Sequence, residues 1–380
     1  MENDDNAAMI YTAGTTGLPK GVVHSHFGLY YTLLGFVETL ETIIPARVKA
    51  QTMIKDVNLG KVVMRDIDVL GLELSNVCLL VLPLCHIYGM MQMFLKYYTG
   101  DRLVILRRFD PVEVFKTMEK FKVSSLDGVP TMWVMLYNHP DIDKYDLSYQ
   151  KYCSCGGAPM PVELLKAWKQ KFGIQIFEGW GMSEIASYGT SSFARPVKYG
   201  SVGKLMQKAS QLKIFDDNDR EVPTGQWGEV VFKGFNVMKG YWNLPEETAR
   251  TIKNGWLYTG DIGYLDDEGY LFLTGRKKDL IIRGGENIFP SDVENILYSN
   301  TKVMECAVIG VPDKVYGEEI KAFVVLKPGE SATEQELIDF CKPHLPTFKQ
   351  PKSVELRESL PKSSVGKILK KELRNLFKKD

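Results

Sequence analysis

MIYTAGTTGLPKG, residues Met9 to Gly21, is the stretch on which the interpretation of the whole chain depends. An apolar run with strand character leads directly into a loop of glycines, small hydroxyl residues and a single lysine. Glycine permits positive φ and lets a ligand approach the backbone, while threonine hydroxyls, backbone N–H groups and Lys20 suit phosphate. The stretch therefore predicts a phosphate-binding loop, whose candidate ligands are Thr12, Ala13, Gly14, Thr15, Thr16, Gly17 and Lys20.

This loop differs from the common nucleotide loop in which Gly-Lys-Ser/Thr opens a helix. Pro19 precedes Lys20 and Gly21 follows it, so we expect a fixed loop rather than the first turn of a helix. Taken alone, the stretch also fits a glycine-rich turn between two strands. Further motifs are needed to choose between the two interpretations.

The charge balance requires such a phosphate site to be local. The 380 residues include 47 Lys and Arg and 47 Asp and Glu. Nothing global therefore attracts the chain to nucleic acid or to an anionic membrane surface. With 44% hydrophobic residues, the chain is long enough for two or three domains with their own cores.

The six cysteines show no metal-ligand spacing and are expected to be free thiols in a reducing compartment. The N-terminal MENDDNAA lacks the basic and apolar regions of a signal peptide, and no apolar run reaches the length of a membrane span. The expected location is the cytoplasm, with the peroxisome and the mitochondrion as alternatives.

Alternating strands and helices predict a layered α/β large domain over residues 1–274. We expect a helix from Ser25 to Leu40, a buried strand from Val77 to Leu84, and a helix from Asp110 to Lys122 with Asp110 as its N-cap. Residues 43–76 have no sustained period and are expected to be an insertion of unknown structure. Short strands and turns over 200–274 predict a small distorted β-barrel.

The charged segment Gly275 to Asp279, GRKKD, is predicted to be a hinge. Residues 280–380 then predict a smaller, mobile α+β C-terminal lid. Ser291 and Thr333 are expected to cap two of its helices, because Glu294 and Glu336 follow at the capping-box spacing.

A second motif, FEGWGMSE at Phe177 to Glu184, places a tryptophan between glycines and follows it with a hydroxyl and a carboxylate. Trp180 can stack on a flat base, Ser183 can donate to phosphate, and Glu184 can hold Mg²⁺. Alone, this motif fits a core or turn tryptophan equally well. The predicted nucleotide contacts here are Glu178, Gly179, Trp180 and Ser183.

A third motif, WLYTGDIG, sets Asp261 at the end of a tight strand. A carboxylate there can accept hydrogen bonds from both ribose hydroxyls. An Asx turn is the structural alternative.

These motifs, followed by GR at Gly275 and Arg276, IIRGGENI and PKSSVGK, occur in the order found in the adenylate-forming superfamily. The chain resembles its acyl and aryl CoA ligase branch from about Met9 to Lys371. The resemblance implies ATP-dependent conversion of a carboxylic acid to an acyl adenylate and then to its CoA thioester, with ATP, Mg²⁺ and coenzyme A. The catalytic residues that it implies are Lys367, Glu184, Ser183 and His86.

The resemblance also implies the remaining binding residues. ATP would additionally contact Gly157, Asp261, Arg276 and Lys278. Coenzyme A would pass Gly284 and Gly285, and the acid would lie against His86, Tyr88, Gly156, Gly157, Gly179 and Met182. Ile282 and Gly284 stand where coumarate ligases carry lysines, so the sequence is more similar to the fatty-acyl branch. A fatty acid of intermediate length is the expected substrate, with an arylacrylate as the alternative.

Members of this superfamily carry a long segment ahead of the phosphate loop, which here begins at residue 9. We therefore expect an N-terminally shortened large domain. Two other functions remain open from the sequence. One is a non-catalytic relative that keeps the nucleotide motifs, and the other is a luciferase-like or carrier-loading enzyme that shares the first half-reaction.

Overall fold

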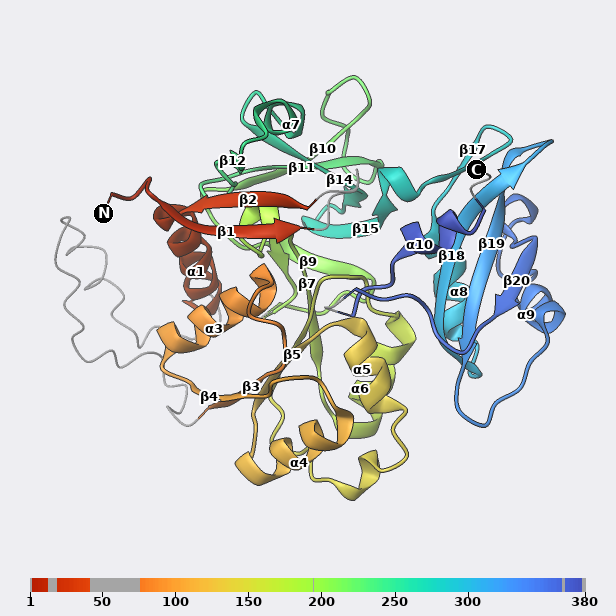
Figure 1. Cartoon of the computed structure of the whole chain (residues 1–380), viewed down its shortest axis with the longest axis horizontal. Helices are drawn as coiled ribbons and strands as arrows, with labels where there is room; N and C mark the ends of the chain where they lie inside the picture. Colours follow the sequence, from red (N-terminus) through yellow and green to blue (C-terminus); the bar gives the residue numbers. More distant parts are fainter. Residues whose placement is uncertain (1, 13–18, 42–75, 194, 364–365, 378–380) are drawn as a thin grey trace.

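The computed structural model describes residues 2–12, 19–193, 195–363 and 366–377, except for 42–75. Figure 1 shows a large N-terminal unit beside a smaller C-terminal unit. The predicted insertion at 43–76 falls almost wholly outside the described residues. The loop residues Ala13, Gly14, Thr15, Thr16 and Gly17 also lie outside them.

A single large sheet organises the N-terminal unit, and half of it is parallel. Its strand order there is β7-β6-β5-β3-β4. The strands are β3 (Val77–Leu80), β4 (Arg102–Ile105), β5 (Ser125–Gly128), β6 (Tyr152–Cys155) and β7 (Ile176–Trp180). The connecting helices are α3 (Ile87–Thr99), α4 (Pro111–Phe121), α5 (Pro130–Tyr137) and α6 (Val162–Phe172). This arrangement confirms the predicted layered α/β fold.

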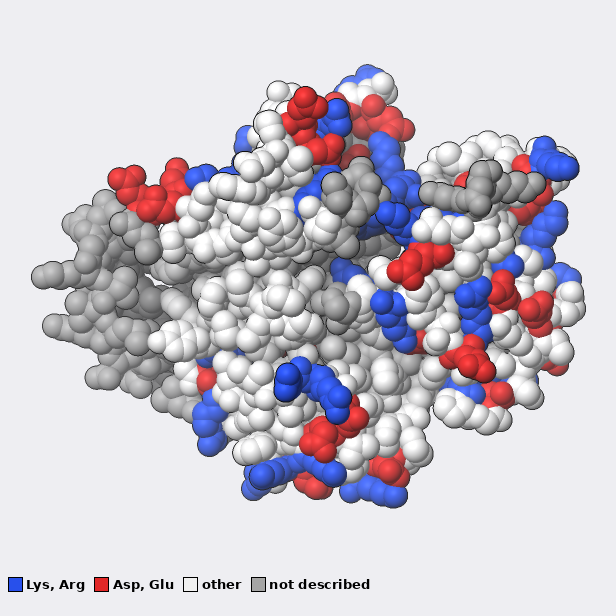
Figure 2. Space-filling model, viewed as in Figure 1, with Lys and Arg blue, Asp and Glu red and all other residues white. Residues whose placement is uncertain are grey.

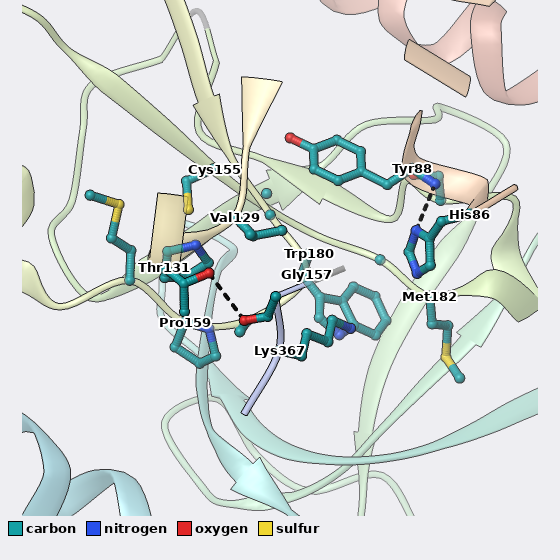
Figure 3. A pocket seen from close by; sticks show the side chains of 18 of the residues that line it. His86, Tyr88, Val129, Thr131, Cys155, Gly157, Pro159, Trp180, Met182 and Lys367 are labelled. Atoms are coloured by element: carbon teal, nitrogen blue, oxygen red, sulfur yellow. Dashed lines mark hydrogen bonds between the residues drawn. The ribbon is translucent and has the colours of Figure 1, made fainter. Parts of the chain in front are cut away.

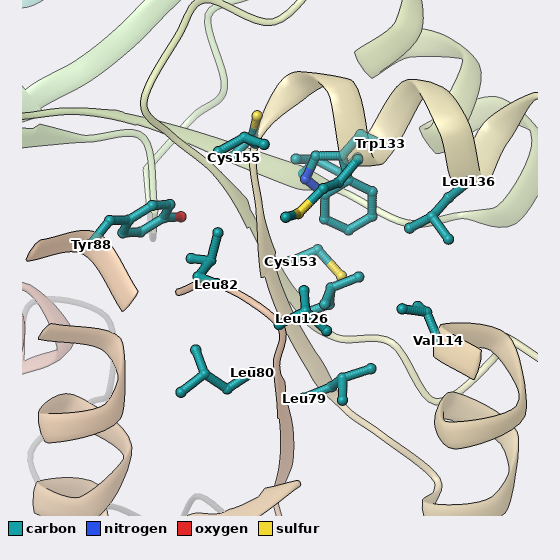
Figure 4. Close-up of a cluster of buried hydrophobic side chains, with 14 of the residues drawn as sticks. Leu79, Leu80, Leu82, Tyr88, Val114, Leu126, Trp133, Leu136, Cys153 and Cys155 are labelled. Atoms are coloured by element: carbon teal, nitrogen blue, oxygen red, sulfur yellow. The ribbon is translucent and has the colours of Figure 1, made fainter. Parts of the chain in front are cut away.

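The core of this half lies between the parallel strands and the helices that cover them (Figure 4). Leu79, Leu126 and Cys153 come from neighbouring strands and are at most 1% exposed. Trp133 of α5 packs edge-on against Trp168 of α6, with ring centres 5.3 Å apart. Strands buried on both faces are expected to be almost continuously apolar, as VCLL is at β3.

The sheet continues past β7 as an antiparallel half in the order β8-β9-β15-β14-β11-β10. These strands are β8 (Thr190–Ser191), β9 (Ser201–Leu205), β10 (Gln211–Phe215), β11 (Gly228–Lys233), β14 (Trp256–Leu265) and β15 (Tyr270–Arg276), with β13 (Ile252–Lys253) paired to β14. A separate sheet is formed by β1 (Asn6–Thr12), β2 (Lys20–Ser25) and β12 (Gly240–Tyr241). The helices α1 (His26–Glu41) and α7 (Pro245–Thr251) flank it.

The small distorted barrel predicted for residues 200–274 is not formed by a single closed sheet. Val22 of β2 shares one buried cluster with Val230 and Phe232 of β11 and with Trp180. The large sheet ends at β10, so the strands do not close on themselves within the described part of the chain. Two sheets around a shared core therefore take the place of one barrel.

The C-terminal unit is a compact α+β fold, as predicted. Its sheet has the order β17-β16-β19-β18, with β20 parallel to β19. Its elements are β16 (Ile281–Arg283), β17 (Glu286–Ile288), α8 (Pro290–Ser299), β18 (Val303–Asp313), β19 (Gly317–Leu326), α9 (Glu334–Cys341), β20 (Ser353–Leu356) and α10 (Lys370–Asn375). The short 3₁₀ segment η3 (Lys277–Asp279) joins it to β15.

The predicted helix caps have different outcomes. Asp110 caps α4, and Thr333 forms a complete capping box with Glu336 at α9. Ser291 was wrongly assigned, because α8 begins one residue earlier at Pro290, and its N-cap Phe289 makes no side-chain cap bond. The Ser291 hydroxyl instead donates to the carbonyl of Thr274, which ties α8 to β15.

Within the described residues, no helix combines the length and the apolar character needed to cross a membrane.

Candidate active site

A cavity of about 1200 Å³ lies where the two units meet. Residues of the β1–β2 hairpin, the carboxyl ends of β6 and β7, and the segment before α10 all line it. The predicted site residues that it brings together are Thr12, Lys20, His86, Tyr88, Gly156, Gly157, Gly179, Trp180, Met182, Ser183, Glu184, Arg276, Lys278 and Lys367. Residues from both ends of the chain thus share one cavity.

Lys367 enters the cavity from the C-terminal unit, beside Gly157 and Trp180 (Figure 3). The loop that carries it is fixed by Thr131, whose hydroxyl donates to the carbonyl of Gly366 at 3.0 Å. Gly157 has φ +86°, and a Cβ atom there would come within 3.1 Å of the Lys367 Cε. Glycine at this position therefore leaves room for the lysine.

Burial, and secondly the positive charge of Arg276, lower the pKa of Lys367 to about 8, while Asp261 and Glu184 oppose the shift. The ammonium form consequently persists at neutral pH in a largely dehydrated place. A positive charge there interacts more strongly with a phosphate than it would in water.

Glu184 and Lys20 approach one another through Tyr241. The Tyr241 hydroxyl donates to Glu184 Oε1 at 2.8 Å, and the Lys20 Nζ lies 5.1 Å from the centre of the tyrosine ring. Lys20 also forms an ion pair with Glu247 of α7. Tyr241 and Glu247 were not predicted from the sequence.

Asp261 lies behind Trp180 and orients it. The indole N–H donates to Asp261 Oδ2 at 2.7 Å, and the Arg276 Nε lies 2.9 Å from Asp261 Oδ1. The negative charge of Asp261 raises the pKa of Arg276, which burial opposes. Figure 2 shows Lys and Arg side chains gathered around η3, near this place where the units meet.

His86 is the N-cap of α3, and its Nδ1 accepts a hydrogen bond from the Tyr88 backbone N–H at 3.2 Å. Burial, and secondly the positive charge of Lys367, lower the pKa of His86 to about 4. The imidazole is therefore neutral at pH 7. The preceding residue, Cys85, is the one exposed cysteine of the six in the chain.

Besides Asp261, three further predicted site residues do not line the cavity. Glu178 does not line the cavity, and its carboxylate accepts a hydrogen bond from the Met160 backbone N–H at 3.2 Å. Burial raises its pKa to about 7. Gly284 and Gly285 form the exposed turn between β16 and β17 and do not line the cavity. Their assignments to ATP and coenzyme A remain predictions.

Two protein-family profiles match separate stretches of this chain. The AMP-binding enzyme profile matches residues 1–242, and the AMP-binding enzyme C-terminal domain profile matches residues 292–367. The chain belongs to the AMP-binding enzyme family, as its motifs indicated.

Two relatives support the assignment to the CoA ligase branch of the family. A long-chain-fatty-acid CoA ligase of Bacillus subtilis is 37% identical over 97% of this chain, and the match covers 61% of that protein. A feruloyl-CoA synthase of an Amycolatopsis species is 35% identical over 98% of this chain and 70% of its own length. The chain thus spans about three fifths of the fatty-acid ligase.

Solved structures give the same fold. The ATP-bound MatB of Rhodopseudomonas palustris matches with a TM-score of 0.85 at 29% identity, over 99% of this chain and 69% of MatB. The o-succinylbenzoate CoA synthetase of Bacillus subtilis, in complex with its acyl-adenylate intermediate, matches with a TM-score of 0.79 at 31% identity, over 100% and 70%.

Proposed function

We propose that the protein activates a carboxylic acid with ATP to an acyl adenylate and then transfers the acyl group to coenzyme A. The observation that carries this proposal is Lys367, a buried cation that the C-terminal unit places in a cavity lined by Lys20, Trp180 and Glu184. The names of the fatty-acid and feruloyl relatives support the same class of reaction.

In the first step, a carboxylate oxygen of the acid attacks the α-phosphorus of ATP and the bond to pyrophosphate breaks. Lys367 would stabilise the negative charge that develops between the acid and the phosphate. Trp180 would stack on the adenine, and Asp261 would accept from the ribose hydroxyls in exchange for its present bond to Trp180 or Arg276. Lys20 would leave Glu247 for the terminal phosphates.

Glu184 would hold Mg²⁺ together with phosphate oxygens of ATP. Magnesium commonly uses one or two protein carboxylates, substrate phosphates and water. Glu184 provides one carboxylate at the cavity wall, and the described residues contain no group of three or more potential metal ligands. This donor set fits a metal that arrives with the nucleotide, whose bound charge would neutralise phosphate oxygens.

In the second step, the thiol of coenzyme A loses its proton and attacks the acyl carbon, and the bond to AMP breaks. We infer that residues 280–380 rotate as a lid about a hinge at 275–279 for this step. Gly284 and Gly285 lie exposed while Lys367 faces the cavity, so the present arrangement suits the first step. Rotation of the lid would take Lys367 out of the cavity and bring Gly284 and Gly285 to it.

The test compares Lys367→Ala with Lys314→Ala, which removes an exposed lysine from the same unit. We expect Lys367→Ala to lower pyrophosphate exchange by about a thousandfold while largely sparing thioester formation from supplied acyl adenylate. The control should retain both activities. Equal loss of both half-reactions in Lys367→Ala would contradict the proposed role, and normal exchange without thioester formation by the unmodified protein would indicate an acceptor other than coenzyme A.

A further inference from the structure

The cavity extends past the proposed reaction centre along one face of α3. Tyr88, Gln92, Lys96 and Thr99 line it at spacings of four, four and three residues, which places them on one side of the helix. At about 1.5 Å per residue, this polar face is about 16 Å long. An apolar substrate channel would be expected to show an apolar helix face instead.

A directed hydrogen-bond chain faces α3 from the sheet. The Ser154 hydroxyl donates to the Asp127 carboxylate, so its oxygen is left to accept from the Tyr88 hydroxyl at 2.8 Å. Asp127 and Ser154 lie on the neighbouring strands β5 and β6 and also line the cavity. We call Tyr88, Gln92, Lys96, Asp127, Ser154 and Tyr188 the inner end of the cavity.

Two polar atoms at the inner end lack a partner among the residues that the structure describes. They are Gln92 Oε1 and the Tyr188 hydroxyl oxygen, in side chains that are 2% and 7% exposed. The Tyr88 and Tyr188 rings stand edge-to-face with centres 6.2 Å apart, and the Gln92 side chain hydrogen-bonds to Tyr88, so both side chains adjoin the directed chain. Buried polar groups are normally hydrogen-bonded, and these two require a polar partner.

The charges at the inner end indicate what that partner is. Burial lowers the pKa of Lys96, but the negative charge of Asp127, and then that of Asp101, outweighs burial and leaves the pKa raised. One lysine therefore faces two aspartates, so a second carboxylate on the substrate would meet repulsion. A hydroxyl is neutral, and it can both donate to the Gln92 oxygen and accept from Tyr188.

We propose that the inner end binds a hydroxyl group, so that the preferred acid carries a hydroxyl at the end opposite its carboxylate. This inference rests on the proposed function, since Lys367 fixes where the carboxylate lies. Both a hydroxylated aryl acid and an aliphatic hydroxy acid present that chemistry.

The experiment uses matched acids with the full chain. One pair is para-hydroxyphenylpropanoate and phenylpropanoate, and the other is omega-hydroxyoctanoate and octanoate, with octanedioate as a third chain acid. We expect the hydroxylated member of at least one pair to bind about tenfold more tightly in equilibrium dialysis, with a similar advantage in kcat/KM for pyrophosphate exchange. An advantage in the aryl pair identifies the substrate as a hydroxylated aryl acid, and an advantage in the octanoate pair identifies it as an aliphatic hydroxy acid.

Gln92→Leu should abolish this preference, whereas Gln335→Leu should leave it unchanged. Gln335 is an exposed glutamine of α9 in the C-terminal unit and does not line the cavity. The ratio between two acids does not depend on how much of a variant is folded.

The proposal is overturned if the hydroxylated and the unsubstituted acid bind equally in both pairs, as they would if water filled the inner end. A preference for octanedioate over omega-hydroxyoctanoate overturns it as well. If no acid supports exchange but the hydroxylated acid still binds more tightly, the proposed function fails and the subsite stands.

Discussion

The large unit presents Trp180 and Asp261 from one continuous sheet, whereas the C-terminal unit presents Lys367 from a loop. Trp180 is the last residue of β7 and is held by Asp261 of β14, two strands of the same sheet. Lys367 depends on the contact between Gly366 and Thr131 across the two units. This difference fits the proposal that the large unit binds the nucleotide and that movement of the C-terminal unit selects the reaction step.

The largest effect expected from this difference is on pH dependence. Because burial holds the pKa of Lys367 near 8, its positive charge is present below that pH and is lost above it. The kcat/KM for ATP in pyrophosphate exchange should therefore fall about tenfold per pH unit above about 8. Lys367→Arg, which stays charged, should remove this alkaline decline even if its rate is lower. A decline shared by both proteins would assign it to another group.

In the large unit, Asp261→Ala should weaken ATP binding by about tenfold or more, because Trp180 and Arg276 lose a shared partner. Isothermal calorimetry with ATP and Mg²⁺ measures the dissociation constant. Asp267→Ala, on the exposed turn between β14 and β15, is the control and should bind normally. An unchanged constant for Asp261→Ala would remove this residue from the nucleotide site.

Where the two units touch, Gly157→Ala should reduce pyrophosphate exchange by about tenfold, because the added Cβ would press on Lys367. Alanine is also strained at φ +86°. Gly173→Ala has the same backbone strain at φ +71° but nothing within 4 Å of the added atom. Both variants should lose similar stability, while only Gly157→Ala should lose exchange. Similar exchange in the two would exclude a steric effect on Lys367.

The smallest expected effect concerns the C-terminal unit alone. Thr333→Ala removes the capping box of α9 and should lower the free energy of unfolding of this unit by about 1 kcal/mol. Ser291→Ala removes no cap, because the Ser291 hydroxyl bonds to Thr274 of β15. This variant should therefore lower the rate of pyrophosphate exchange and leave the free energy of unfolding of the unit unchanged. Urea unfolding followed by circular dichroism separates the two cases.

Much of this organisation could be predicted, because local sequence carries strands, caps and phosphate motifs. The periodic helices at α4 and α6 and the capping box at Thr333 follow from residues close together in the chain. The capping role expected of Ser291 was wrong because its hydroxyl finds a tertiary acceptor 17 residues away.

The site could be predicted only where motifs mark it. Tyr241 and Glu247 come from a short strand and a short helix without a recognisable motif, and only the fold brings them beside Lys20 and Glu184. The polar face of α3 is different, since Tyr88, Gln92 and Lys96 recur every four residues inside an otherwise apolar helix. That period could have revealed the inner end from the sequence.

The exposure of Cys85 offers a direct way to test the proposed movement of the C-terminal unit. It is the only one of the six thiols open to solvent, and it directly precedes His86 at the cavity. A maleimide dye should therefore attach at one place without removing any cysteine. Its fluorescence would report whether residues 280–380 leave the cavity when coenzyme A is added.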